Sequence, residues 1–245
     1  MSEPLRLAAG AAWALRQRAE REAARRFARL AGAIGEFDPG SPLVAMLLRG
    51  ADDELRHAGL YAELCASYGQ ALEPEQPERR IAPPLLSGRQ AALYEMVAAC
   101  CITETESVAT LATLLSERAD PHIHVILHEV ARDEVMHSRM GWAHLSREAG
   151  VHDVTFLSRW LPAMLSGAVE AGLFLDGPPE PDAEELPRHG LLPRARRREN
   201  FPRTLLEVVL PGLARFGVDP APGRAWLSGQ EASAAPAQPG AVDGG

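Results

Sequence analysis

The distribution of proline constrains the fold of this chain most, because proline cannot occupy the interior of a regular helix. Widely spaced prolines separate long stretches rich in alanine, leucine, arginine and glutamate, which favour helix. These stretches predict helices over 5–35, 42–69, 88–118 and 121–149, with a fifth over 154–175. We therefore expect an all-α fold with additional C-terminal helices.

The connections between these helices predict how they are arranged. The links at 35–41 and 117–121 are short, so each should join an antiparallel pair of helices. The stretch 69–88 is 20 residues long and contains four prolines, which is long enough to cross a whole bundle. Two antiparallel hairpins joined by one long crossover are typical of the ferritin-like four-helix bundle.

The helical signal weakens beyond residue 176. Six of the 20 prolines lie in 176–203, and a short helix kinked at Pro211 is predicted over 204–216. The final residues are small, polar and proline-rich. We expect a helical domain over 1–176, an extension over 177–227 that packs on the bundle and shapes any pocket, and a disordered tail over 228–245.

One five-residue pattern occurs twice, as Asp-Glu-Leu-Arg-His at 53–57 and as Asp-Glu-Val-Met-His at 133–137. In each copy the glutamate and the histidine stand three positions apart, which places both side chains on one face of a helix. Such a pair can bind a metal ion. A single copy would most often be ordinary helix surface, but two copies on two predicted helices call for one explanation.

A bundle that holds two metal ions takes a Glu-x-x-His pair from each of two helices and one glutamate from each of the others. In the first helix Glu20 continues an apolar stripe, whereas Glu22 lies among arginines. In the third helix Glu104 lies on an apolar face, whereas Glu106 lies among threonines. The predicted metal ligands are Glu20, Glu54, His57, Glu104, Glu134 and His137.

The depth of these glutamates along the helices agrees with a common site. Each of the four lies 13 to 15 residues from the short link of its own hairpin. At about 1.5 Å per residue, all four carboxylates reach nearly one level of the bundle. Tyr61 lies on the same face as His57, and we interpret it as a buried core tyrosine.

On these residues the chain resembles the ferritin-like di-iron carboxylate proteins, which include rubrerythrins, bacterioferritins, ribonucleotide reductase small subunits and bacterial di-iron oxygenases. The resemblance covers about 10–150. The stretches around Glu104 and 126–134 look especially like bacterial proteins related to di-iron arylamine N-oxygenases. The resemblance implies that Asp53 and Asp133 each accept a hydrogen bond from the far ring nitrogen of a ligating histidine, which would orient the ring.

Four carboxylates and two imidazoles suit iron or manganese better than softer metals. We expect two iron ions, with a mixed manganese and iron pair as the alternative. The resemblance implies reaction with O2 or peroxide and oxidation of a small organic substrate. The sequence has no flavin or nicotinamide motif and no rubredoxin-type cysteine pairs, so we expect an external electron donor such as a reductase or ferredoxin.

Two other functions are compatible with the pattern. The first is an iron-handling or peroxide-scavenging protein, and the second is a helical scaffold without metal. The roughly one hundred residues that follow the bundle favour oxidation of an organic substrate, because iron handling needs only four helices. The chain could also pair as a homodimer.

Composition excludes several further classes. The net charge of −8 argues against a nucleic-acid surface. The three cysteines have neither zinc spacing nor the spacing of a disulfide framework, which favours a reducing, cytoplasmic setting. No run approaches the roughly 18 apolar residues of a membrane span. The apolar run 7–15 lacks the flanks of a signal peptide.

Overall fold

The computed structural model describes residues 1–72, 74, 77, 80–86, 88–169, 172–175, 180 and 182–234. Within these ranges the chain is all-helical and contains no strand. The main α-helices are α1 (Glu3–Phe37), α2 (Pro42–Ser67), α3 (Gly88–Met96), α4 (Glu104–Leu115), α5 (Pro121–Ala149), α6 (Leu161–Ala168), α7 (Arg194–Thr204), α8 (Leu210–Ala214) and α9 (Ala221–Ala234). Shorter 3₁₀ and π segments join some of them.

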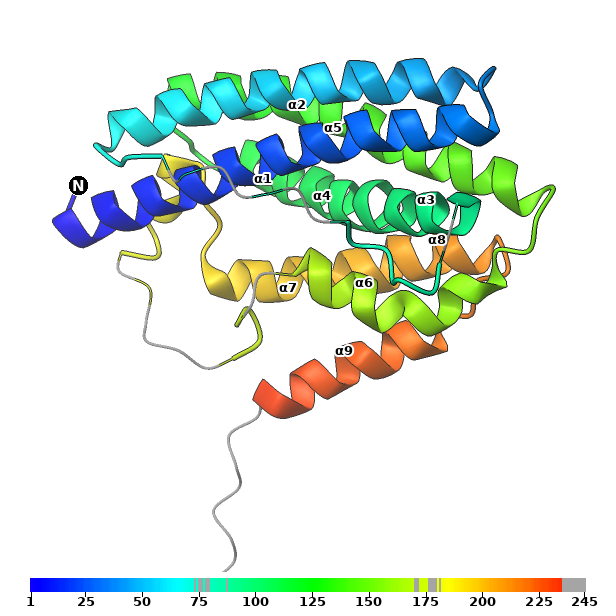
Figure 1. Ribbon diagram of the computed structural model, residues 1–245. Coiled ribbons are helices and arrows are strands. Elements are labelled where there is room, and N and C mark those ends of the chain that lie inside the picture. Colours follow the sequence, from blue (N-terminus) through cyan, green and yellow to red (C-terminus); the bar gives the residue numbers. More distant parts are fainter. Residues whose placement is uncertain are drawn as a thin grey trace, which may run out of the picture.

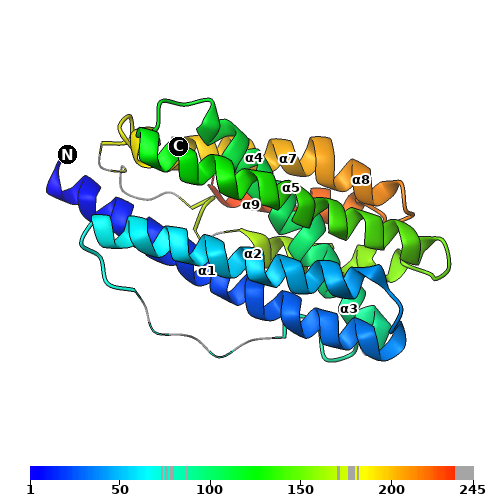
Figure 2. The same cartoon turned by 90° about the horizontal axis from the view of Figure 1, so that it is seen from above.

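Two pairs of long helices run side by side (Figures 1 and 2). Helices α1 and α2 are antiparallel, and α5 runs back along the helical stretch that ends with α4. Helix α2 ends near the start of α1, whereas α3 begins at the opposite end of the molecule. The end of α2 and the start of α3 therefore lie at opposite ends of these helices.

The sequence explains where the long helices begin. Each of α1, α2 and α5 carries proline in its first turn, where the missing N–H has no helical partner to lose. Ser2 and Asp120 precede α1 and α5, and their side chains accept hydrogen bonds from the free backbone N–H groups of the first turn. The predicted bounds of these three helices agree with the structure within a few residues.

The predicted helix over 88–118 is not regular, which corrects that expectation. A π-helical segment, η1 (Val97–Thr103), separates α3 from α4, and α4 ends at Leu115. The hydroxyl of Thr103 donates to the carbonyl of Ala98, five residues earlier, at 3.0 Å. π-Helical turns inside α-helices occur frequently at functional sites, and this one ends directly before Glu104.

The C-terminal part also differs from expectation. The fifth helix is a 3₁₀ turn, η2 (Thr155–Trp160), followed by α6, and it ends at Ala168 rather than 175. Helix α7 begins at Arg194 and continues through a π segment, η4 (Leu205–Val209), into α8. The first part of the tail expected to be disordered belongs to α9, and 235–245 lie outside the described residues.

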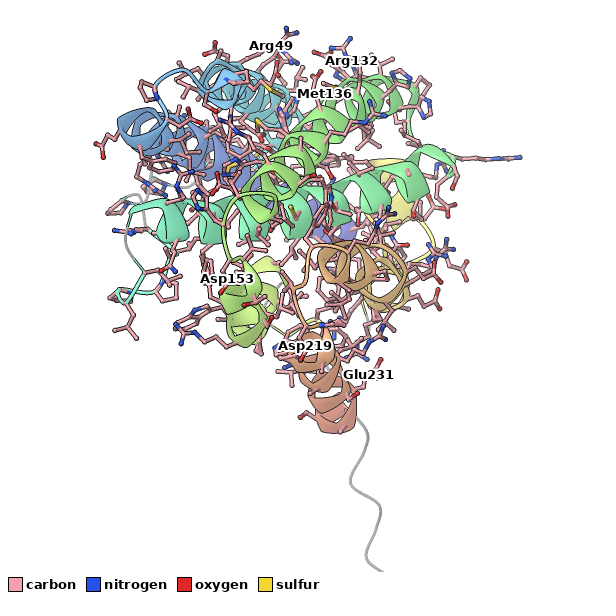
Figure 3. The ribbon with its side chains drawn as sticks, turned by 90° about the vertical axis from the view of Figure 1, so that its right-hand side faces the viewer. Arg49, Arg132, Met136, Asp153, Asp219 and Glu231 are labelled. Carbon is pink, nitrogen blue, oxygen red and sulfur yellow. The ribbon has the colours of Figure 1, made fainter. Side chains whose placement is uncertain are left out.

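The C-terminal helices form a further layer on one side of the long helices. In Figure 1, α6, α7 and α8 lie below α3 and α4, and α9 lies beneath them. Figure 3 shows Asp219 and Glu231 on this lower side, whereas Arg132 and Met136 lie on the opposite, outer side of α5. The apolar residues of α6 to α9 pack with those of α3 and η1 in one core cluster.

One helical stretch, Gly88–Leu115, is long and apolar enough to cross a membrane by length and composition. Its most apolar window is 56% buried inside the protein. The same composition occurs in core helices. This stretch lies between α1 on one side and the C-terminal helices on the other.

Candidate metal centre

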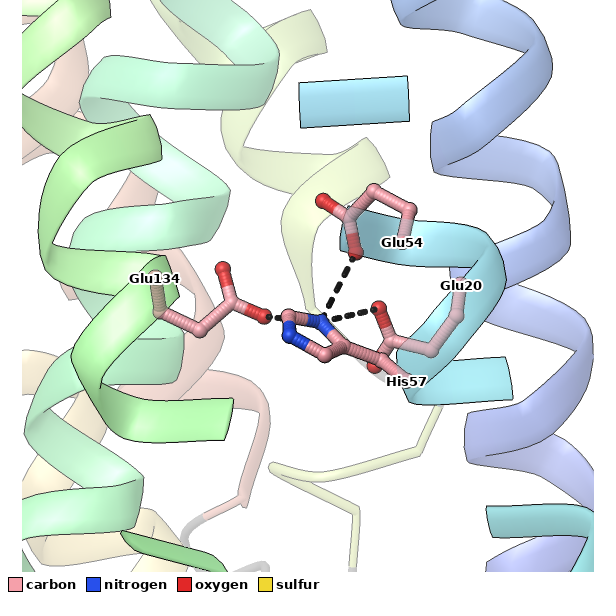
Figure 4. Close-up of side chains that lie close together, drawn as sticks. All are labelled: Glu20, Glu54, His57 and Glu134. Atoms are coloured by element: carbon pink, nitrogen blue, oxygen red, sulfur yellow. Dashed lines mark hydrogen bonds and ion pairs between the residues drawn. The ribbon is translucent and has the colours of Figure 1, made fainter. Parts of the chain in front are cut away.

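Three of the long helices place carboxylates and an imidazole at one point in the interior. Glu20 comes from α1, Glu54 and His57 come from α2, and Glu134 comes from α5 (Figure 4). One ligand atom from each of these four side chains lies within 4.8 Å of all the others. Glu54, His57 and Glu134 are buried, and Glu20 is mostly buried. This group has the composition of a metal site.

The remaining two predicted ligands lie at the same point. His137 Nδ1 lies 3.1 Å from Glu54 Oε1 and 3.4 Å from Glu134 Oε2. Glu104 is the first residue of α4, is buried, and interacts with the carboxyl group of Glu134. The structure therefore brings all six predicted residues together, from two pairs of helices.

The two histidines have equivalent orientations. His57 Nδ1 faces the cluster, 3.3 Å from Glu54 Oε2, and its Nε2 lies 3.3 Å from Asp133 Oδ2 on the opposite helix. His137 Nδ1 also faces the cluster, and its Nε2 lies 3.6 Å from Asp53 Oδ2. Each aspartate thus approaches the histidine of the other motif, which the sequence alone does not predict.

Arg56 connects the two motifs, a role that sequence reasoning missed. Its Nη2 lies 2.8 Å from Asp53 Oδ1 and 2.8 Å from Asp133 Oδ2, and its Nη1 donates to Glu129 at 2.9 Å. Its position inside the first motif was visible in the sequence. Its role depends on α5 lying opposite α2, which only the tertiary structure shows.

Burial and crowding determine the protonation of the cluster. Burial raises the pKa of Glu20 and of Glu104 well above the usual range, and neighbouring carboxylates raise both further. Burial opposes ionisation of Glu54, but the nearby imidazoles of His137 and His57 outweigh it and lower its pKa. Burial also opposes the charge on His137, but Glu134 and Glu54 outweigh it and raise its pKa to about 11. Protons therefore balance the carboxylates in the metal-free protein.

Several buried polar atoms of the cluster have no hydrogen-bond partner. Those that face the cluster are Glu54 Oε1, Glu134 Oε2 and His137 Nδ1. These atoms lie close to one another without the geometry of a hydrogen bond, and leaving buried polar atoms unpaired costs free energy. Atoms directed at a common point are what a metal ion requires, so the donor set and its geometry fit a divalent ion.

A cavity of about 690 Å³ lies beside the cluster. Glu20, Glu104 and Glu134 line it, and Tyr61 also borders it. The rest of its wall comes from α1, the end of η1, α4, the end of α6, α7 and described residues between α6 and α7. Small molecules could therefore reach the carboxylates from the side that the C-terminal layer covers.

The glutamates not chosen as ligands have other roles. Glu22 pairs with Arg18, with 3.8 Å between the carboxylate and the guanidinium. Glu106 lines the cavity, and its carboxylate accepts a hydrogen bond from the Thr110 hydroxyl at 2.8 Å. Tyr61 is buried, and its ring lies 5.1 Å from that of Trp13.

Comparisons with known proteins do not place the chain in a family. No protein-family model, no curated protein and no solved structure matches it. The residues of the cluster and the cavity beside it are therefore the basis for inferring a function.

Proposed function

We propose that this chain is a ferritin-like di-iron carboxylate protein that uses O2 to oxidise a small organic substrate. The observation that carries the proposal is the buried cluster of Glu and His side chains from four helical segments, with unpaired ligand atoms directed at a common point. Glu20, Glu54, His57, Glu104, Glu134 and His137 would hold the two ions.

The proposed architecture is a four-helix bundle of two antiparallel hairpins with a long crossover. Helices α1 and α2 would form one hairpin, and the stretch Gly88–Leu115 with α5 would form the other. The contributions of the helices support this, because a bundle that binds two metals takes Glu-x-x-His from two helices and one glutamate from each of the others.

The donor set suits iron or manganese, and we propose a pair of iron ions. Carboxylate oxygens and imidazole nitrogens suit iron and manganese, and the three cysteines lie outside the set of ligands. When bound, a pair of ferrous ions would provide electrons for the activation of O2, and an external reductase or ferredoxin would restore them. Two divalent ions would also replace the protons that balance the carboxylates in the metal-free protein.

The residues of the chain itself prepare the site. Asp133 Oδ2 lies close to His57 Nε2 and would hold the proton of that nitrogen, which leaves Nδ1 free to bind metal. Asp53 lies behind His137 in the corresponding position, but at 3.6 Å from Nε2 it is too distant for a hydrogen bond. The burial of the carboxylates excludes bulk water from the ions, and the cavity would admit O2 and the substrate.

The cavity favours substrate oxidation over iron handling or peroxide scavenging. Metal storage needs a path for ions alone, but this space reaches about 690 Å³ and has apolar walls from Leu173, Leu191, Leu192 and Phe201. Binding cavities for small organic molecules are typically 300–1,000 Å³ and mostly apolar. A reacting molecule could lie there against three of the proposed ligands.

Metal content tests the proposal. The purified chain should bind about two ferrous ions without oxygen and should develop an absorption band when exposed to O2. Glu54→Ala should lose the ions because it removes a buried ligand in contact with both histidines. Glu63→Ala, an exposed glutamate on the same helix, is the matched control and should bind as the wild type does. Failure of the wild type to bind iron, or full binding by Glu54→Ala, would contradict the proposal.

A further inference from the structure

The cavity beside the cluster contains a cationic side chain that the proposed metal site does not use. Arg16 lies on α1, four residues before Glu20, and it lines the same cavity. At about 1.5 Å per residue, its backbone is about 6 Å from that of the metal ligand along the helix axis. A molecule bound to Arg16 would therefore extend toward the ions.

The structure holds the Arg16 guanidinium in place without neutralising it. Nη1 donates to the carbonyl of Gly190 at 3.0 Å, and the guanidinium lies 4.7 Å from the centroid of the Trp13 ring. None of the described residues places a carboxylate oxygen within 4.0 Å of Arg16. Burial lowers the pKa of Arg16, yet a guanidinium remains charged at neutral pH.

Gly190 is required for this arrangement. Its φ of +72° is in the left-handed region, and a Cβ atom would come within 2.8 Å of the Trp13 ring. The chain therefore passes close enough to α1 for the Gly190 carbonyl to accept the Arg16 hydrogen bond. A guanidinium has five N–H donors, and the bond to Gly190 is the one hydrogen bond that Arg16 makes to the described residues.

The other charged groups around Arg16 already have interactions of their own. Glu20 belongs to the proposed metal site, and Glu106 accepts a hydrogen bond from Thr110 and lies beyond ion-pair distance of Arg16. Arg197, on the opposite wall, pairs with Glu180 at 3.2 Å. Arg16 is partly buried and forms no ion pair within 4.0 Å among the described residues, so a ligand that brings an anion would be stabilised there.

We propose that the cavity binds a small carboxylic acid whose carboxylate pairs with Arg16 and whose apolar body lies against Leu173, Leu191, Leu192 and Phe201. The inference rests on the proposed function, because the carboxylic acid would be the substrate. Arginine matches a carboxylate with two parallel hydrogen bonds, which fixes the orientation of the ligand as well as its charge. The end of the molecule opposite the carboxylate would lie at the metal ligands.

Arg26 is the competing anchor, since it also lines the cavity. It lies six residues beyond Glu20, on the other side of the metal ligand along α1. The structure favours Arg16 because a hydrogen bond and an aromatic ring hold its side chain in position. The experiment separates the two.

Binding of a model acid and its neutral analogue tests the inference. Phenylacetate and phenylacetamide have similar shapes and differ in charge. Calorimetry is done with the full chain, both metal-free and loaded with redox-inert Zn²⁺. In both forms phenylacetate should bind at least about 10-fold more tightly than phenylacetamide. Arg16→Gln should weaken phenylacetate by roughly 10- to 100-fold and leave phenylacetamide nearly unchanged. Arg16→Lys, which keeps the charge but loses the paired geometry, should fall between them.

The controls keep the inference falsifiable. Arg18→Gln changes an arginine of α1 that pairs with Glu22 and does not line the cavity, and it should bind as the wild type does. Circular dichroism shows whether Arg16→Gln folds. If it does not, the comparison of phenylacetate with phenylacetamide on the wild type and on Arg16→Lys still tests the inference. Equal affinity for acid and amide, no saturable binding, or loss of binding in Arg26→Gln but not in Arg16→Gln would overturn the inference.

The two proposals fail in different ways. Wild type that binds Zn²⁺ and iron but not phenylacetate would overturn the substrate class and leave the metal site standing. Wild type that binds phenylacetate through Arg16 but no metal would overturn the proposed oxidation and leave a carboxylate-binding cavity. Metal content of Arg16→Gln should equal that of the wild type, because Arg16 does not contact the ligand cluster by any ion pair.

Discussion

The two Asp-Glu-x-x-His motifs are nearly identical in sequence but differ in their surroundings. The fourth residue of the motif in α2 is Arg56, which binds both aspartates. The fourth residue of the motif in α5 is Met136, which is 51% exposed and points to the outer surface (Figure 3). The ligands are therefore symmetric, whereas the arginine that bridges the two aspartates comes from the α2 motif alone.

The two motifs also differ in how closely an aspartate contacts each histidine. Asp133 contacts Arg56, Arg132 and His57, all within 3.3 Å. Burial opposes ionisation of Asp133, but Arg132 and His57 outweigh it and lower its pKa. Asp53 contacts Arg56 at 2.8 Å but lies 3.6 Å from His137, beyond hydrogen-bond distance. A duplicated motif thus need not give two equally supported ligands.

The largest effect that separates the two motifs should come from the aspartates. Asp133→Asn should weaken metal binding by about 10- to 100-fold, as loss of an outer partner of a ligating histidine typically does. Asp53→Asn should weaken it by only a few-fold, because its contact with His137 is longer. Competition with a chelator for Zn²⁺ measures both. Equal losses, or a larger loss in Asp53→Asn, would show that the asymmetry has no effect on the metal.

The sequence predicted the parts of this site that depend on local geometry. The spacing of Glu54 and His57 places both on one face of a helix wherever that helix packs. The choice of Glu20 over Glu22 followed from the apolar stripe of α1, and the structure places Glu20 in the cluster and Glu22 against Arg18. The bounds of α1, α2 and α5 followed from the spacing of the prolines.

The parts that depend on which helices meet could not be predicted. The approach of Asp133 to His57 and of Arg56 to both aspartates needs the register of α2 against α5. The sequence of the π segment before Glu104 gave no sign of its irregular hydrogen bonding. Its close contact with α5 was also not predictable, and a Cβ on Gly141 would lie 2.3 Å from the Cβ of Cys100.

Glycine substitutions should reveal a second difference between the two pairs of helices. A Cβ on Gly141 would also meet the backbone of η1 at 3.1 Å, and a helix backbone cannot rotate away as a side chain can. Overpacking typically costs 1–3 kcal/mol, and the gain in helix propensity recovers up to about 1 kcal/mol, so Gly141→Ala should lower the free energy of unfolding by about 1–2 kcal/mol. A Cβ on Gly50 would meet the Phe27 ring at 3.0 Å, and a small tilt of that ring should leave Gly50→Ala close to the wild type.

Gly59→Ala is the matched control for both glycines. A Cβ added to Gly59, on α2, would have no heavy atom of another part of the chain within 4 Å. The variant should therefore gain only helix propensity, which raises the free energy of unfolding by up to about 1 kcal/mol. Urea unfolding of the metal-free variants gives the three values. A Gly141→Ala protein as stable as Gly59→Ala would mean that η1 and α5 do not approach each other so closely.

The smallest effect should come from the residue that differs between the motifs. Arg56→Met should weaken Zn²⁺ binding by a few-fold, because the side chain is 37% exposed and solvent screens its ion pairs. Met136→Ala should change binding little, since no ligand depends on its exposed side chain. Arg56→Lys should recover part of the loss, because an ammonium keeps the charge but lacks the planar fork that reaches three carboxylates.

The relation between the Arg56 and Asp133 effects is more informative than either alone. If Arg56 acts by holding Asp133 against His57, Arg56→Met should add little once Asp133 is asparagine, because residues in one network are not additive. Chelator competition on the double variant, beside both single variants, measures this coupling. Full additivity would mean that Arg56 affects the metal only through its charge, and the bridge between the motifs would then be a feature of packing alone.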